Sequence, residues 1–315
     1  MVESPAMMNE IIKDTTESLL DMPLDELISR ADALRREYIG DKMELCSIIN
    51  AKSGRCTEDC KFCAQSARHN TNVLVHPLKE KAEMVQAAKN AKEIGAKNFG
   101  IVTSGNKLTN AEVQTIAEAV SEITQSIGIS PCASLGALEK KQLQLLKRSG
   151  LTRYHHNIET SRNFYPKIVS THSFDERIET IKAAKEIGMK VCSGGIIGLG
   201  EKWQDRIEMA QTLKELNVDS VPLNILIPIP GTPLENIESI SIDDVIRTIC
   251  IFRIILKDKT IKVAAGRESV LKDSQPKAFQ AGANGMIIGG YLTIKGATVS
   301  SDNALIEEVK KLWKK

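Results

Sequence analysis

Three cysteines within eight residues constrain this chain more than any other feature. They lie in Cys56-Thr-Glu-Asp-Cys60-Lys-Phe-Cys63, a mostly polar stretch that follows the apolar run at residues 47–50. Cysteines that only fill a core lie in apolar surroundings, so this stretch favours thiols that bind metal. Structural zinc sites and most iron–sulfur clusters take four protein ligands, whereas three thiolates leave one iron of a four-iron cluster open. The stretch therefore predicts a metal centre with room for an added ligand.

Two other interpretations of these thiols stay open. A zinc site would need a fourth ligand, for which His69 and His76 are near enough in sequence, and a disulfide would leave one thiol over. The spacing, with an aromatic residue before the last cysteine, resembles the signature of the radical S-adenosylmethionine (AdoMet) enzymes. The resemblance implies that Cys56, Cys60 and Cys63 hold a [4Fe–4S] cluster whose open iron binds AdoMet.

Charge and composition exclude several classes of function. The chain has 315 residues, a formal net charge of +2 and 4% aromatic residues, which argues against nucleic acid and acidic membranes as partners. No apolar run approaches the length of a membrane span. Seven cysteines and a polar, acidic segment at residues 1–21, unlike a signal peptide, indicate reduced thiols or metal ligands. We expect a soluble cytoplasmic protein.

Short apolar strands alternate with amphipathic helices from about residue 44. The pattern predicts strands at 45–50, 98–103, 129–134, 152–157, 189–194, 219–225, 260–265 and 285–289. Thr109-x-x-Glu112 and Ser173-x-x-Glu176 predict capping boxes at two helix starts. Eight such units without a linker favour an α/β fold, a single closed (β/α)8 TIM-type barrel, over an open doubly wound sheet.

Apolar residues at helical spacing, among them Ile11, Ile12, Leu27 and Ile28, predict a helical segment before the barrel. We therefore expect an N-terminal helical extension at residues 1–43 and a barrel with a C-terminal cap at residues 44–315. In a barrel the ends of the strands and the loops after them carry the site. The three-cysteine loop follows the first strand and so lies at that face.

Four cysteines lie outside this loop: Cys46, Cys132 and Cys192 in predicted strands, and Cys250 in a predicted helix. Strand side chains alternate in direction, so three strand thiols that face a barrel interior would make a second metal site. Each one alone is equally typical of a small buried hydrophobe. We interpret Cys250, in an apolar helix, in this second way.

Five segments resemble the biotin synthase family in order and spacing: residues 154–161, 190–201, 221–224, 231–233 and 264–268. The resemblance implies a sulfur insertion that converts dethiobiotin to biotin, with one AdoMet consumed for each hydrogen abstracted and an auxiliary iron–sulfur cluster as sulfur donor. Methylornithine synthase and the hydrogenase maturase that resembles it share the three-cysteine loop and remain alternatives. A non-catalytic iron–sulfur carrier is a third.

The resemblance also implies a set of auxiliary-cluster ligands. Cys132 and Cys192 match the family's thiolates and Arg267 matches its unusual arginine ligand, although a guanidinium is normally a donor that pairs with a carboxylate or sulfide. The family has a further cysteine on the second strand, where this chain has Gly100. We predict that Cys46 on the neighbouring first strand replaces it. The auxiliary cluster would be a two-iron ([2Fe–2S]) or a four-iron form.

Further residues match positions that contact AdoMet or substrate in the family. Thr103 and Ser104 would contact the methionine part of AdoMet, Arg177 its carboxylate and Ile196 its adenine. Asn157 and Glu159 would face both the AdoMet ribose and the substrate. For Arg177 a solvated charge on a helix surface is the alternative. Asn157 and Asn224 would bind the ureido ring, because an amide offers both a donor and an acceptor.

His155 stands where the family's Tyr-Asn-His-Asn pattern has asparagine, and we place it among the substrate contacts. Gly194 and Gly195, in the 190–201 segment, are expected to let the backbone approach a bulky cofactor. The resemblance further implies a flavodoxin or ferredoxin reductant, iron–sulfur assembly proteins as partners, and a homodimer.

Overall fold

The structure, a computed structural model, describes residues 18–292 and 296–314. Within these residues, nine parallel strands form one sheet in the order β5-β4-β3-β2-β1-β9-β8-β7-β6, and a pairing of β5 with β7 closes it into a barrel. The strands are β1 (Glu44–Lys52), β2 (Asn98–Thr103), β3 (Ser130–Ser134), β4 (Arg153–His155), β5 (Lys190–Cys192), β6 (Gly195–Ile197), β7 (Ser220–Ile225), β8 (Thr260–Val263) and β9 (Gly285–Ile287). The predicted closed α/β barrel is confirmed.

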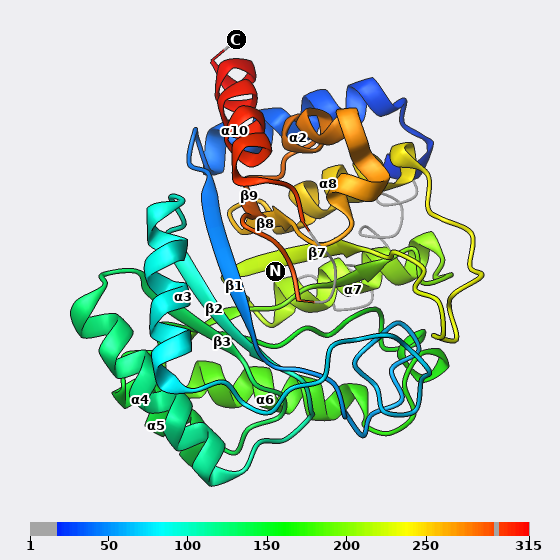
Figure 1. The fold of residues 1–315 in the computed structure, drawn as a ribbon. Helices are drawn as coiled ribbons and strands as arrows, with labels where there is room; N and C mark the ends of the chain where they lie inside the picture. The colour runs from blue at the N-terminus through cyan, green and yellow to red at the C-terminus, as the bar shows by residue number, and fades with distance from the viewer. Residues whose placement is uncertain (1–17, 293–295, 315) are drawn as a thin grey trace, which may run out of the picture.

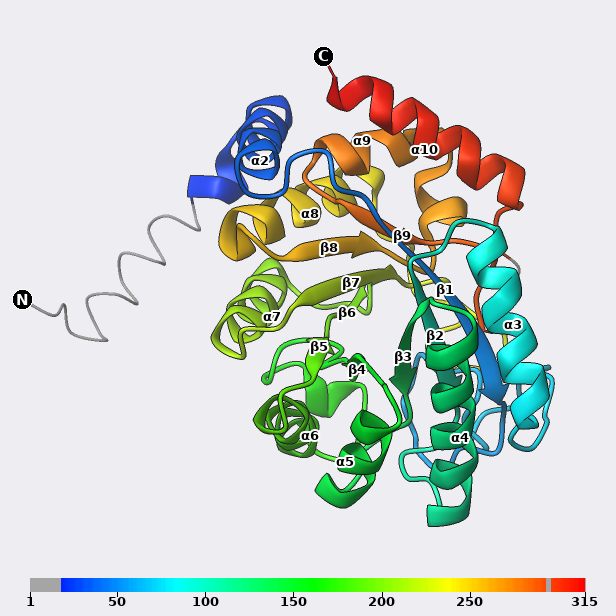
Figure 2. The ribbon, with the colours of Figure 1, turned by 90° about the vertical axis from the view of Figure 1, so that its left-hand side faces the viewer.

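Helices surround the strands (Figures 1 and 2). Those after the first strand are α3 (Lys81–Glu93), α4 (Asn110–Ser126), α5 (Lys140–Arg148), α6 (Phe174–Glu186), α7 (Trp203–Glu215), α8 (Ile242–Leu256), α9 (Gln275–Gln280) and α10 (Val299–Trp313). Short turns are the 3-10 helices η1 (Tyr165–Lys167) and η3 (Lys272–Ser274) and the π-helix η2 (Arg267–Leu271). Thr109 and Ser173 form the predicted capping boxes of α4 and α6.

The predicted fifth strand is split. Both β5 and β6 pair with β7, through Cys192 with Ser220 and Gly195 with Leu223, so they occupy one place in the barrel. Pro222 lies between the two pairings and has no N–H to donate. The Gly194 N–H instead donates to the side-chain oxygen of Asn157 at 3.1 Å. The ladder therefore breaks at the point where the chain turns toward Asn157.

The N-terminal helix α2 (Leu24–Tyr38) packs against α8 and lies close to α10 (Figure 2). Arg247 of α8 donates to the carbonyls of Leu19 and Met22, at 3.1 and 2.8 Å, and the Arg35 guanidinium stacks 4.3 Å above the ring of Trp313. Part of the predicted helical extension is thus present, while Ile11 and Ile12 lie outside the described residues. The boundary at residue 43 stays a prediction.

The hydrophobic core forms one cluster that includes the inner faces of the helices. Cys250 is fully buried in α8, which confirms its interpretation as a core residue. Within the described ranges, no helix combines the length and the apolarity that crossing a bilayer requires.

Candidate active site

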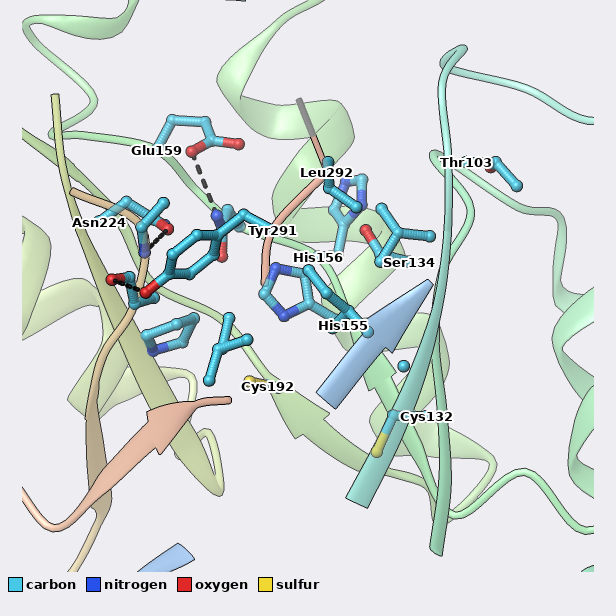
Figure 3. Close-up of a pocket in the computed structure, with 18 of the residues that line it drawn as sticks. Thr103, Cys132, Ser134, His155, His156, Glu159, Cys192, Asn224, Tyr291 and Leu292 are labelled. Carbon is cyan, nitrogen blue, oxygen red and sulfur yellow. Dashed lines mark hydrogen bonds between the residues drawn. The ribbon is translucent and has the colours of Figure 1, made fainter. Parts of the chain in front are cut away.

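A cavity of about 420 Å³ runs into the barrel from the loops after the strands. It is lined by Cys56 and Cys60 of the three-cysteine loop and also by Cys46, Cys132 and Cys192 from β1, β3 and β5. Figure 3 shows the side chains of Cys132 and Cys192 toward one end of the view and Glu159 and Thr103 toward the other. One cavity thus joins the two sets of thiols that the sequence singled out.

The three-cysteine loop is held by its own backbone and by a distant segment. The Cys56 N–H donates to the Gln65 carbonyl at 3.1 Å and the Cys63 N–H to the Cys60 carbonyl at 2.9 Å. The Asp59 carboxylate accepts from the backbone N–H groups of Ser170 and Thr171 at 2.9 and 3.2 Å. These bonds fix the thiols by tying their loop to residues that precede α6.

The zinc interpretation finds no support in this geometry. The His69 ring contacts the Cys63 carbonyl and the His76 ring contacts the Pro77 carbonyl, each through Nδ1 at 2.9 Å. In the described part of the chain, no three His, Cys, Asp or Glu side chains converge around a point where one ion would sit.

A thiol on the second strand at Gly100 would require the Ile48 side chain to shift. Register places Gly100 between Ile48 of β1 and Cys132 of β3, and a Cβ built on Gly100 would lie 3.0 Å from Cγ2 of Ile48. Cys46 lies two residues before Ile48 on β1 and lines the same cavity. The apolar side chain of Ile48 fills the space beside Gly100, and the nearest thiol on that side comes from Cys46.

Sequence reasoning missed a buried charge network beside these thiols. Lys262 of β8 donates to Sγ of Cys46 at 3.2 Å and pairs with Glu44 at 2.7 Å. Arg153 of β4 pairs with the same carboxylate at 2.5 Å. Lys262 and Arg153 both line the cavity, and Nε of Arg153 is buried without a partner in the described structure. Two cations and one anion leave a net positive charge next to Cys46, Cys132 and Cys192.

This charge network changes how readily the thiols ionise. Burial alone raises the pKa of a thiol, but Lys262 and His155 outweigh it and lower the pKa of Cys192 to about 6. Burial dominates at Cys132, where the pKa rises to about 12. The thiolate is the form that binds metal, so Cys192 is prepared for that role at neutral pH.

Glu44 is expected to stabilise the folded chain strongly, because its removal leaves two buried cations uncompensated. Burial would raise its pKa, but Lys262 and Arg153 lower it to about 2. Glu44→Gln should lower the free energy of unfolding of the metal-free protein by about 3 kcal/mol in denaturant titrations. A folded-state pKa below the unfolded value contributes stability above pH 4.5 that is lost as the pH falls toward 2.

The matched control is Glu83→Gln, which removes an exposed carboxylate paired with Lys79, four residues earlier, while the Gln oxygen can keep the capping bond from the Glu80 N–H. Such surface pairs contribute little, so no measurable change is expected. Equal stability of the two variants would contradict the role assigned to Glu44.

Arg267 lies outside the cavity lining. Its guanidinium pairs with Asp302 and, at 3.1 Å, with Glu268, and its Nε donates to the Tyr291 hydroxyl at 3.1 Å. Tyr291 itself lines the cavity, as Figure 3 shows. The structure therefore places Arg267 in the carboxylate pairing that was its alternative interpretation, behind Tyr291. This placement does not support Arg267 as a cluster ligand.

Most of the predicted AdoMet contacts lie together. Thr103, Asn157, Glu159 and Arg177 line the cavity near the three-cysteine loop, and the Thr103 hydroxyl is buried with no partner in the described structure. Arg177 is half-buried and its Nη1 donates to the Asn157 carbonyl at 2.9 Å. Arg177 is therefore not the solvated surface charge that was its alternative. An unpaired hydroxyl and a half-buried guanidinium suit a polar, carboxylate-bearing ligand.

Two predicted AdoMet contacts lie outside the lining. The Ser104 hydroxyl donates to the Gly54 carbonyl at 2.8 Å, which ties β2 to the start of the three-cysteine loop. Ile196 is half-buried on β6 and packs against the core cluster. Neither placement tests a contact with AdoMet, so both roles stay predictions.

The predicted substrate contacts His155 and Asn224 line the cavity as well. The amide nitrogen of Asn224 donates to the Gly195 carbonyl at 3.2 Å, and its oxygen accepts from the Ala265 N–H at 3.2 Å. These bonds fix the amide plane, which Figure 3 shows beside Tyr291.

Gly194 and Gly195 let two segments of the chain approach each other closely, and their predicted approach to a cofactor stays a prediction. A Cβ on Gly194 would lie 2.0 Å from the Pro222 carbonyl oxygen, and one on Gly195 would lie 2.2 Å from that of Glu159. Glu159 adopts a φ of 69°, which is costly for a residue with a Cβ. Its N–H and carbonyl are bonded to Gly194 and Ile196 at 3.1 and 2.8 Å. Close backbone contact at the two glycines thus positions the Glu159 carboxylate at the cavity.

Comparisons with known proteins agree with this geometry. The family model for the Radical SAM superfamily matches residues 51–241, and that for the Biotin and Thiamin Synthesis associated domain matches residues 222–310. The chain is 49% identical to biotin synthase of Thermotoga petrophila, over 94% of this chain and 98% of that protein. It is 45% identical to biotin synthase of Clostridium botulinum, over 95% and 94%.

Two solved structures share the fold. A methylornithine synthase superposes with a TM-score of 0.78 at 21% identity, covering 96% of this chain and 91% of that one. The FeFe-hydrogenase maturase of Carboxydothermus hydrogenoformans superposes with a TM-score of 0.77 at 18% identity, covering 96% and 79%. At identities this low, the two structural similarities show a shared fold and nothing further.

Proposed function

Because the chain belongs to the biotin synthase family of the radical SAM superfamily, we propose that it inserts sulfur into dethiobiotin to give biotin. The observation that carries the proposal is one cavity lined by Cys56 and Cys60 of the three-cysteine loop at one end and by Cys46, Cys132 and Cys192 inside the barrel. A hydrogen-abstracting centre and a sulfur donor must both reach one substrate, and this cavity provides that arrangement.

The residues at the loop end fit the cofactors that the family implies. Cys56, Cys60 and Cys63 would hold the [4Fe–4S] cluster, and Arg177 and Glu159 would bind the carboxylate and the ribose of AdoMet. A bound cluster would supply the one-electron reduction of AdoMet on which hydrogen abstraction from an unactivated carbon depends. The residues of this chain would orient AdoMet relative to the substrate.

The residues inside the barrel fit an auxiliary cluster. We assign Cys46, Cys132 and Cys192 as its thiolates, in a two-iron or a four-iron form. Lys262 and Arg153 would offset the negative charge of the thiolates and sulfides and donate hydrogen bonds to them. Arg267 takes no part in this assignment, since its guanidinium is engaged with Asp302 and Glu268.

Substrate would lie between the two groups of thiols. Asn224 and Asn157, which line the cavity, would bind the ureido ring of dethiobiotin, and His155, beside Cys192, would contact the same substrate. A flavodoxin or ferredoxin reductant, iron–sulfur assembly proteins, a homodimer and a cytoplasmic location complete the proposal.

The test is an assay on anaerobically reconstituted protein. With reductant, AdoMet and dethiobiotin, the enzyme should form biotin, and iron and sulfide analysis should give more than about four irons per chain. Four irons, AdoMet cleavage and no biotin would indicate a different radical AdoMet enzyme. Bound iron without AdoMet cleavage would indicate an iron–sulfur carrier.

A further inference from the structure

His172, in the loop before α6, lies between the three-cysteine loop and Arg177. Its Nδ1 lies 2.7 Å from the Glu58 carboxylate, and its Nε2 lies 2.9 Å from Nη2 of Arg177. Glu58 belongs to the three-cysteine loop, and all three side chains line the cavity. The ring thus joins the loop that holds the first cluster to the arginine that faces AdoMet.

Hydrogen-bond chemistry fixes the state of this ring. A guanidinium has only donors, so Nε2 of His172 must be the acceptor. The ring is then neutral, carries its proton on Nδ1 and donates that proton to Glu58. Burial and the charge of Arg177 lower the pKa of His172, and the opposing effect of Glu58 does not cancel them. The neutral tautomer therefore agrees with the electrostatics as well as with the geometry.

The other hydrogen bonds of the Arg177 guanidinium show which of its N–H groups stay available for a ligand. Nε donates to the Tyr165 hydroxyl at 2.6 Å and Nη1 to the Asn157 carbonyl at 2.9 Å. Nη1 also lies 3.7 Å from the Glu159 carboxylate, an ion pair longer than a hydrogen bond. A guanidinium has five N–H groups. The hydrogen bonds described here, with that to His172, take three of them and leave one N–H on each terminal nitrogen. Two N–H groups on adjacent nitrogens match the two oxygens of a carboxylate.

We infer that His172 is a positioning residue, which holds Arg177 at the angle that AdoMet binding requires and couples that angle to the three-cysteine loop through Glu58. The inference rests on the proposed function, because it takes the ligand of Arg177 to be the AdoMet carboxylate. His172 touches neither the cluster nor AdoMet in this scheme. It acts only through the arginine.

The test compares His172→Leu, which removes both hydrogen bonds, with His172→Gln, whose amide keeps one donor and one acceptor. Equilibrium AdoMet binding is measured on anaerobically reconstituted protein, with iron per chain determined for each sample. The Leu variant should bind AdoMet about tenfold more weakly, since a hydrogen bond to a charged group is lost. The Gln variant should restore most of the affinity, and the iron content should not change.

The control is His76→Leu, because the His76 ring contacts only its neighbouring backbone carbonyl among the interactions described and does not line the cavity. Its AdoMet affinity should equal that of the wild type. Wild-type affinity in His172→Leu with full iron would overturn the inference alone. A wild-type protein with a full cluster that binds no AdoMet would overturn the proposed function and the inference together.

The pH dependence of AdoMet affinity is a second test, and it applies even if the Leu variant loses its cluster. His172 is faced by Glu58 from the loop, Arg177 and Glu176 from α6, and the edge of Tyr165. Protonation of Nε2 would break the bond to Arg177, so wild-type affinity should fall as the pH drops below the ordinary histidine value of 6.5. The Gln variant should lack this loss. Identical pH profiles for the two proteins would overturn the inference.

Discussion

A Cys46→Ala variant is expected to build the three-cysteine cluster in full and to lose its auxiliary iron, and biotin formation should fall to background. Cys46 is one of three thiols that the barrel interior offers to a second cluster, and Ile48 fills the space where β2 would supply another. With two thiolates left, the Lys262 ammonium faces a methyl group in place of the Sγ that it now contacts at 3.2 Å. Mössbauer spectra and iron counts per chain would measure the loss.

The matched control for this variant is Cys250→Ala. Cys250 is a fully buried thiol of α8 that does not line the cavity. Its replacement should leave iron content and biotin formation unchanged and affect stability alone. Full auxiliary iron in Cys46→Ala would refute the ligand set proposed here.

Cys60→Ala is expected to have the opposite effect. It should keep the auxiliary iron and abolish AdoMet cleavage, because two thiolates no longer hold a four-iron cluster with one open iron. The loss should exceed the roughly 100-fold effect of removing an outer-shell partner of a metal site. Release of 5'-deoxyadenosine and methionine under reducing conditions measures it directly.

Comparing the two variants in one series makes each a control for the other. If the cavity holds two separate clusters, each variant loses one set of irons and keeps the other. Residual AdoMet cleavage near the wild-type level in Cys60→Ala would show that the three-cysteine loop is not the radical-forming site.

Much of this architecture was predictable because it depends on local pattern. Alternating strands and helices, capping boxes at Thr109 and Ser173 and the spacing of the cysteines all act within a few residues. The interruption after β5 was not predictable in this way. It depends on Pro222, which lies on the neighbouring strand β7 and deprives the ladder of an N–H.

The candidate site was predictable where residues follow a motif and obscure where they depend on tertiary contacts. Lys262 shares a strand face with Ala264 in an otherwise apolar strand, so strand alternation alone could have indicated it as an inward-facing charge. Arg267 shows the reverse case. It starts the π-helix η2 directly after Gly266, and its guanidinium pairs with Asp302, 35 residues later. No local pattern encodes that partner.

The contact between Lys262 and Cys46 spans 216 residues of sequence, whereas the bonds that fix the three-cysteine loop reach only to residues 168–172. Contacts of such different range form at different stages of folding and synthesis. The loop site is complete once the chain has been made as far as α6. The auxiliary site cannot form until β8 has paired with β9, and β9 with β1, to close the barrel. A nascent chain is thus expected to become competent for its first cluster well before its second, which sets an order for iron loading.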